Sequence, residues 1–119
     1  MVRSTWSALT SSYSAEDRAL LAAYRELVAS LDGVEERIHA KEIDFAVKRV
    51  FSSAYVKSHW LEVGIELTRV AAREPHLRSH FSSGSRTTMH RFTLSTAAQL
   101  TRLKPLLIES RDSVGPGFR

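Results

Sequence analysis

The chain contains no cysteine, only a few glycines and prolines, and no long apolar run. The absence of cysteine excludes disulfides, thiolate catalysis and cysteine-based zinc sites. Because a membrane-spanning helix needs about 18 consecutive apolar residues, no such helix is expected. Residues 1–14 hold one arginine and no continuous apolar core. We therefore expect no secretory signal there, and a cytoplasmic location is the default prediction.

The composition is typical of one globular domain, with 119 residues of which 43% are hydrophobic and 25% charged. A chain of this length can bury about two thirds of its unfolded surface. The net charge of +4 mildly favours an anionic partner. The basic residues are scattered and do not form a stripe interleaved with aromatics, so nucleic acid is not an expected partner. We predict a lead-in over 1–13, a single domain over 14–114 and a tail over 115–119.

Both ends of this domain carry helix signals. Ser14 can cap a helix whose first turn contains Glu16 and Asp17. Apolar residues then recur at three- and four-residue steps, which is typical of one buried helix face: Leu20, Leu21, Tyr24, Leu27, Val28 and Leu31. Residues Thr96–Gln99 resemble a capping box that opens a C-terminal helix. Pro105 predicts a kink or a late restart of that helix.

Between the helices, apolar and polar residues alternate as they do in strands with one buried face. The expected strands cover 34–38, 43–47, 51–55, 61–67 and 88–94, with a hairpin connection at 57–59. Residues 70–86 lose the alternation and contain Pro75 and a serine-glycine cluster, which predicts a loop. The fold class is therefore α+β: an antiparallel sheet of four to five strands with N- and C-terminal helices packed on one face.

A metal site is not expected from the histidines. His76 and His80 have the i,i+4 spacing that places two imidazoles on one helix face. However, the residues between them include no glutamate of the kind that serves zinc hydrolases as a base. Pro75 also argues against a helix there. The sequence thus predicts neither a metal nor another cofactor.

The segment 82–88 is a weak candidate for anion binding. It offers hydroxyls, a permissive Gly84 and the guanidinium of Arg86. It lacks the lysine and glycine spacing of a Walker loop, so a surface loop is the simpler interpretation. No Gly-x-Ser-x-Gly elbow is present, and the many serines therefore do not indicate a hydrolase.

Five further residues are candidate ligand contacts. Lys48 lies opposite the expected core face of its strand, and Arg49 falls where the alternation breaks, at a turn or bulge that can re-aim a side chain. His90 alternates in phase with apolar residues, so its imidazole should be half-buried and need a polar partner. Tyr55 and Trp60 can line a ligand cleft. The simpler interpretation is a surface lysine and arginine, a hydrogen-bonded core histidine and packed aromatics.

The strand block resembles a small bacterial family known as domain of unknown function 5655. The matching positions run from residue 34 to residue 94: Val34, Phe45, Lys48, Arg49, Phe51, Leu61, Val63, Ile65, Leu67, Gly84, His90 and Leu94. In pattern terms the resemblance covers about residues 14–112. The chain differs from the family at Lys41, where a small hydroxyl residue is usual, and at 52–53, where an alanine and an aromatic are usual. The resemblance implies an α+β fold with Lys48, Arg49 and His90 as the residues of interest, and it implies no established activity.

Three functions are compatible with these features, and whether the protein is an enzyme stays open. The leading hypothesis is a binding module whose uncovered sheet face and loops meet a small or acidic ligand. The first alternative is a small biosynthetic enzyme that uses His90 with a strand carboxylate, for which Asp44, Glu62 and Glu66 are the candidates. The second is a protein-interaction subunit or homodimer joined through an edge strand.

Overall fold

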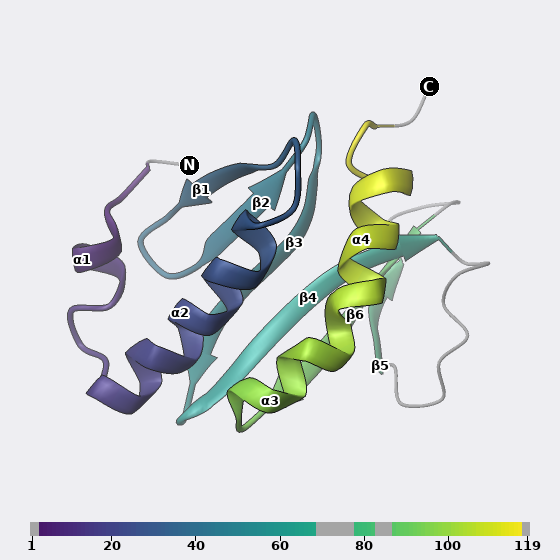
Figure 1. Ribbon diagram of the computed structural model, residues 1–119. Helices are drawn as coiled ribbons and strands as arrows, with labels where there is room; N and C mark the ends of the chain where they lie inside the picture. The colour runs from purple at the N-terminus through teal and green to yellow at the C-terminus, as the bar shows by residue number, and fades with distance from the viewer. Residues whose placement is uncertain (1–2, 69–77, 83–86, 118–119) are drawn as a thin grey trace.

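The computed structural model describes residues 3–68, 78–82 and 87–117. A six-stranded antiparallel sheet, in the order β1-β2-β3-β4-β6-β5, carries helices on one face (Figure 1). The elements in chain order are α1 (Trp6–Leu9), α2 (Ala15–Ala29), β1 (Glu35–Ile38), β2 (Ile43–Ala46), β3 (Val50–Lys57), β4 (Trp60–Thr68), β5 (Arg78–Ser82), β6 (Thr87–Leu94), α3 (Ala97–Leu100), the 3-10 helix η1 (Thr101–Leu103) and α4 (Lys104–Ser113).

This arrangement confirms the α+β class and the antiparallel sheet with helices packed on one face. The sheet has one strand more than expected, because β5 forms inside the segment for which a loop was predicted. Strand β5 pairs with β6 and lies at the edge of the sheet. Of the histidine pair considered for metal, His76 lies outside the described residues, as do Gly84 and Arg86.

The helix boundaries follow the local signals in the sequence. Ser14 is the N-cap of α2, and its hydroxyl accepts a hydrogen bond from the Asp17 amide at 3.1 Å. Thr96 and Gln99 form the expected capping box at the start of α3. Pro105 lies in the first turn of α4, where its missing amide costs no helical hydrogen bond. The C-terminal helix therefore restarts at Lys104 after η1, as the proline predicted.

The register between β2 and β3 contains a bulge. Phe45 pairs with Ser52 and Ala46 pairs with Val50, so Phe51 is the extra residue on β3. A bulge places neighbouring side chains on the same side of the strand. Consistently, both Phe51 and Ser52 are fully buried. The bulge also ends the β2–β3 pairing next to the turn that contains Arg49.

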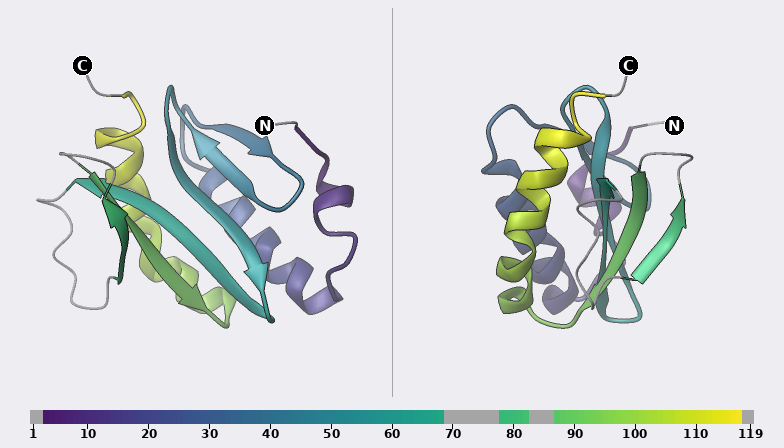
Figure 2. Two further views of the ribbon diagram at one scale, coloured as in Figure 1. Left: turned by 180° about the vertical axis from the view of Figure 1, so that it is seen from behind. Right: turned by 90° about the vertical axis from the view of Figure 1, so that its right-hand side faces the viewer.

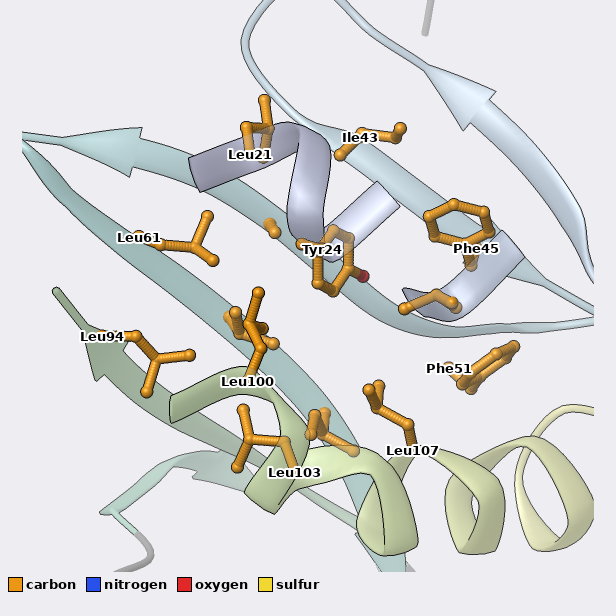
Figure 3. Packing of buried hydrophobic residues seen from close by; sticks show 14 of the residues in the cluster. Leu21, Tyr24, Ile43, Phe45, Phe51, Leu61, Leu94, Leu100, Leu103 and Leu107 are labelled. Carbon is orange, nitrogen blue, oxygen red and sulfur yellow. The ribbon is translucent and has the colours of Figure 1, made fainter. Parts of the chain in front are cut away.

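The core lies between the sheet and the helices (Figure 3). Val63 and Ile65 are both 0% exposed, which confirms their expected burial. The rings of Tyr24 and Phe45 meet edge to face, with centroids 5.8 Å apart. Further large core side chains come from α2, the strands, η1 and α4, among them Leu21, Val28, Ile43, Leu61, Leu67, Leu103 and Leu107.

One buried hydrogen-bond chain crosses this core. The Ser52 hydroxyl donates to the Gly64 carbonyl at 2.8 Å, which leaves its oxygen free to accept from the Tyr24 hydroxyl, also at 2.8 Å. Burial raises the pKa of Tyr24 far above its usual range, so the phenol stays a neutral donor. The chain therefore satisfies both buried hydroxyls at the contact between α2 and the sheet.

Among the described residues, no helix has the length and apolar character needed to cross a membrane.

Candidate functional site

The candidate site lies on the sheet face turned away from α2 and α4, which we call the open face. Figure 2 shows α2, α3 and α4 together on one side of the sheet, and no helix of the described residues covers β4 and β6 on the other side. Val63 and Ile65 point into the core, so their neighbours on β4 point to the open face. Those neighbours are Glu62, Gly64 and Glu66.

The two β4 carboxylates of the open face each form an ion pair with an arginine whose side chain is more exposed than the carboxylate. Glu62 is 8% and Glu66 6% exposed. The Arg91 Nη1 atom lies 3.8 Å from Glu62 Oε1, and Arg49 Nη2 donates to Glu66 Oε2. The arginine side chains retain 34% and 37% exposure respectively. The carboxylates are therefore buried beside the sheet, while the arginine side chains remain partly exposed.

A serine, a glycine and a methionine lie between the two pairs. Gly64 lies opposite Ser53 on β3 and opposite Arg91 on β6. The Met89 side chain reaches over Gly64, because a Cβ placed on the glycine would lie 3.0 Å from the methionine sulfur. Tyr55 lies opposite Glu62 and is half-buried. Arg49 and Arg91 thus flank a central surface made of a hydroxyl, a glycine and a thioether.

Arg49 reaches this face from the turn between β2 and β3. The amides of Lys48 and Arg49 donate to the Gly115 carbonyl at 2.9 and 2.8 Å, which fixes the turn. The irregularity expected near Arg49 is present as the bulge and this turn. Lys48 is exposed. Lys48 and Arg49 were grouped as candidates because they are neighbours in the sequence. Of the two, only Arg49 is shown in contact with a carboxylate of the open face.

His90 lies on the opposite side of the sheet. It pairs with Ile65 in the β4–β6 register and is 4% exposed, so it faces the helices. His90 is therefore more deeply buried than the half-buried imidazole that the sequence predicted. Because Glu62 and Glu66 project from the other face, the structure does not bring His90 together with these carboxylates or with the Arg49 guanidinium. The predicted set of Lys48, Arg49 and His90 is therefore divided between two faces.

The aromatic candidates share the open face. Trp60 lies opposite Lys57, and Tyr55 lies diagonally beside it. Trp60 is 50% exposed, at the start of β4. These positions are compatible with a common aromatic contact surface for a ligand. The structure does not describe Arg86, the remaining candidate from the sequence.

Sequence reasoning missed a buried acidic cluster beside the open face. His39 Nε2 lies 2.9 Å from Asp44 Oδ2, and both residues are 8% exposed. The neighbouring Asp44 carboxylate, together with partial burial, raises the pKa of Glu42 to about 7. His39 Nδ1 and Asp44 Oδ1 have no hydrogen-bond partner among the atoms of the structure. When Glu42 is protonated, the repulsion between its carboxyl group and the neighbouring Asp44 carboxylate is removed. The predicted strands 34–38 and 43–47 implied a connection over 39–42, but the side-chain contact between His39 and Asp44 was not predicted.

It also missed a surface cavity of about 380 Å³ between the start of α2, the β3–β4 turn and the start of α3. Its polar lining includes Ser95 and a pair formed by Asp17 Oδ2 and His59 Nδ1, 2.9 Å apart. Asp17 is buried, whereas the His59 side chain is 82% exposed.

Within the described ranges, no group of three histidine or carboxylate side chains is suited to a metal ion.

Comparison of the chain with protein-family models, curated proteins and solved structures found no match. The likeness to domain of unknown function 5655 therefore stays a prediction.

Proposed function

We propose that the protein is a binding module for a small anionic ligand, which it holds on the open face between Arg49 and Arg91. The observation that carries the proposal is the layering of charge on this face. The carboxylates of Glu62 and Glu66 are buried beside the sheet, and each pairs with an arginine whose side chain remains about one third exposed.

This arrangement of buried carboxylates paired with partly exposed arginines favours the binding of an anion for two reasons. A buried carboxylate fixes the guanidinium with which it pairs, so little side-chain entropy is lost when a ligand binds. A guanidinium also carries five N–H donors in a planar fork, so one arginine can bind a structural carboxylate and a ligand oxygen together. Ser53 adds a hydroxyl between the two arginines, and Tyr55 and Met89 offer contact area to an apolar portion of the ligand.

The geometry gives less support to an enzyme built on His90. A general base must lie within hydrogen-bond reach of its substrate. His90 is nearly completely buried on the helix-facing side, whereas Glu62 and Glu66 belong to the open face. A ligand on the open face is separated from the imidazole by the sheet itself. We therefore favour binding over acid-base catalysis as the function of these residues.

The test is a titration of the purified protein with inorganic phosphate, citrate and adenosine monophosphate at constant ionic strength. Binding is followed by backbone and arginine side-chain NMR signals. The informative variant replaces a complete ion pair, as Arg91→Gln with Glu62→Gln. It removes one positive and one negative charge, so the net charge is unchanged and no buried charge is left alone. We expect affinity for the preferred anion to fall about 10-fold or more, as for a lost charge-assisted hydrogen bond.

The matched control is Arg102→Gln, which removes an exposed arginine from η1 on the helix side of the molecule. If binding depends only on overall positive charge, this control should lose as much affinity as the paired variant or more. That result, or the absence of shifts at Gly64 and Met89 with all three anions, would contradict the proposal.

A further inference from the structure

We propose that the C-terminal end of α4 and the residues that follow it position Arg49 for the ligand. This inference rests on the proposed function of the open face, because it assigns the means by which one of its two arginines is held. In Figure 1 the end of α4 lies beside the turn that joins β2 to β3, and the rear view in Figure 2 shows the same proximity. The contacts between these segments come from backbone groups and one buried hydroxyl.

The first contact is made by the Gly115 carbonyl. It accepts hydrogen bonds from the amides of Lys48 and Arg49, at 2.9 and 2.8 Å. One carbonyl thus satisfies two successive turn amides, and these fix the backbone from which the Arg49 side chain departs. Gly115 is itself tied to the end of α4, since its amide donates to the Ser110 carbonyl at 3.0 Å.

The second observation is that residue 115 has no room for a side chain. A Cβ built there would overlap the Arg111 carbonyl and lie 2.8 Å from a methyl group of Val47. Real Cβ atoms do not approach so closely, and the Arg111 carbonyl belongs to the backbone, so it cannot turn aside as a side chain can. Glycine at this position therefore allows the C-terminal segment to lie directly against the turn.

The third contact connects the same helix end to the partner of Arg49. The Ser110 hydroxyl is completely buried and is placed to donate to the carbonyls of Phe51, at 3.2 Å, and Glu66. Phe51 is the bulge residue that follows the turn, and Glu66 is the carboxylate that pairs with Arg49. A single helix end thus holds the backbone on both sides of the ion pair.

These contacts make Gly115 and Ser110 positioning residues, which act on the ligand only through Arg49 and Glu66. Neither residue belongs to the open face, and Ser110 is buried beneath the sheet on the side of α4. A loss of either contact should therefore change the placement of the guanidinium while leaving every side chain of the open face chemically intact.

The experiment compares Gly115→Ala with Gly33→Ala. Gly33 has a positive φ of 78° and nothing within 4 Å of a built Cβ. Alanine there destabilises through backbone strain and supplies a control for general loss of stability. Inorganic phosphate is titrated well below the melting temperature of each variant. We expect Gly115→Ala to weaken phosphate binding about 10-fold, as if Arg49 were lost, while Gly33→Ala retains the wild-type affinity.

A second readout needs no ligand. Arg49→Gln, Glu66→Gln and the double variant form a cycle, and the non-additive part of their melting-temperature shifts measures the Arg49–Glu66 coupling. This coupling should largely disappear in the Gly115→Ala background and persist in the Gly33→Ala background. If Gly115→Ala fails to fold, Ser110→Ala takes its place, with the same direction and a smaller loss expected.

The outcomes separate the two proposals. Unchanged coupling in the Gly115→Ala and Ser110→Ala backgrounds overturns the positioning role, whatever phosphate does. Equal losses of affinity and coupling in the Gly33→Ala control overturn it as well, because instability alone would then explain them. Loss of coupling in a protein that binds no anion supports the positioning of Arg49 and overturns the proposed function.

Discussion

The neighbouring Asp44 carboxylate, together with partial burial, raises the pKa of Glu42 from 4.5 to about 7. The folded state therefore binds this proton more tightly than the unfolded chain does. The stabilising contribution is complete below the ordinary pKa and is lost as the pH rises through about 7. Above that pH, two neighbouring carboxylates repel each other next to the edge strand β1.

Replacing Glu42 with glutamine should remove this pH dependence, because glutamine keeps a donor for Asp44 and cannot ionise. We expect the wild-type melting temperature to fall more between about pH 5 and about pH 8 than that of Glu42→Gln. Thermal unfolding followed by circular dichroism measures the difference. Glu26→Gln, at an exposed position of α2, is the control and should follow the wild type. If the melting temperatures of wild type and Glu42→Gln change with pH in the same way, protonation of Glu42 beside Asp44 contributes nothing to stability.

The β3–β4 hairpin turns through Ser58 and His59, whose φ angles are 51° and 70°. Two-residue hairpin turns with both φ values positive favour asparagine followed by glycine, because other residues meet steric strain in this region. The β3–β4 turn therefore contains backbone strain at His59, the residue whose side chain contacts Asp17. The long, regular register of β3 with β4 holds the turn in place despite this strain.

Substitution at residue 58 tests this account of the hairpin. Ser58→Asn should stabilise the protein by roughly 0.5 kcal/mol or more, because asparagine tolerates a positive φ. Ser58→Val should destabilise it, since a β-branched side chain is strongly disfavoured there. Chemical denaturation gives both free energies of unfolding, and the two variants control each other because they change the same exposed position. A stabilising valine, or equal effects of the two, would contradict a turn-based explanation.

At the scale of the whole molecule, the sequence predicted the elements whose hydrophobic spacing and capping residues are visible within their own residues. Strand β4 alternates regularly and buries one face completely, and α2 has both an apolar stripe and a capping serine. Strand β5 was missed because Arg78–Ser82 has a single apolar residue and no alternation. Pairing with β6 places it in the sheet, and pairing between distant segments leaves no local signal.

The candidate site was predictable only in part, for the same reason. Arg49 was singled out because the alternation breaks there, and Glu62 and Glu66 were named only as candidate strand carboxylates. The Arg49–Glu66 contact, however, joins residues 17 positions apart, one in the β2–β3 turn and the other on β4. Arg91 was not singled out from the sequence. Gly115 was interpreted only as the end of the ordered domain, because a carbonyl that accepts two distant amides has no signature in sequence.

The packing of the whole molecule depends on Ile65, at the centre of β4 in the middle of the sheet. Its side chain is 0% exposed, and both α2 and α4 pack on this strand. Ile65→Ala should therefore lower the free energy of unfolding by about 2–5 kcal/mol, as lost burial and a new cavity add together. Thr93→Ala is the control, since Thr93 is exposed on β6 and a surface substitution should change stability by less than about 0.5 kcal/mol. Urea denaturation at equilibrium measures both variants. An Ile65→Ala variant as stable as Thr93→Ala would mean that the two helices do not depend on this strand, and the register of β4 derived from its alternation would then be wrong.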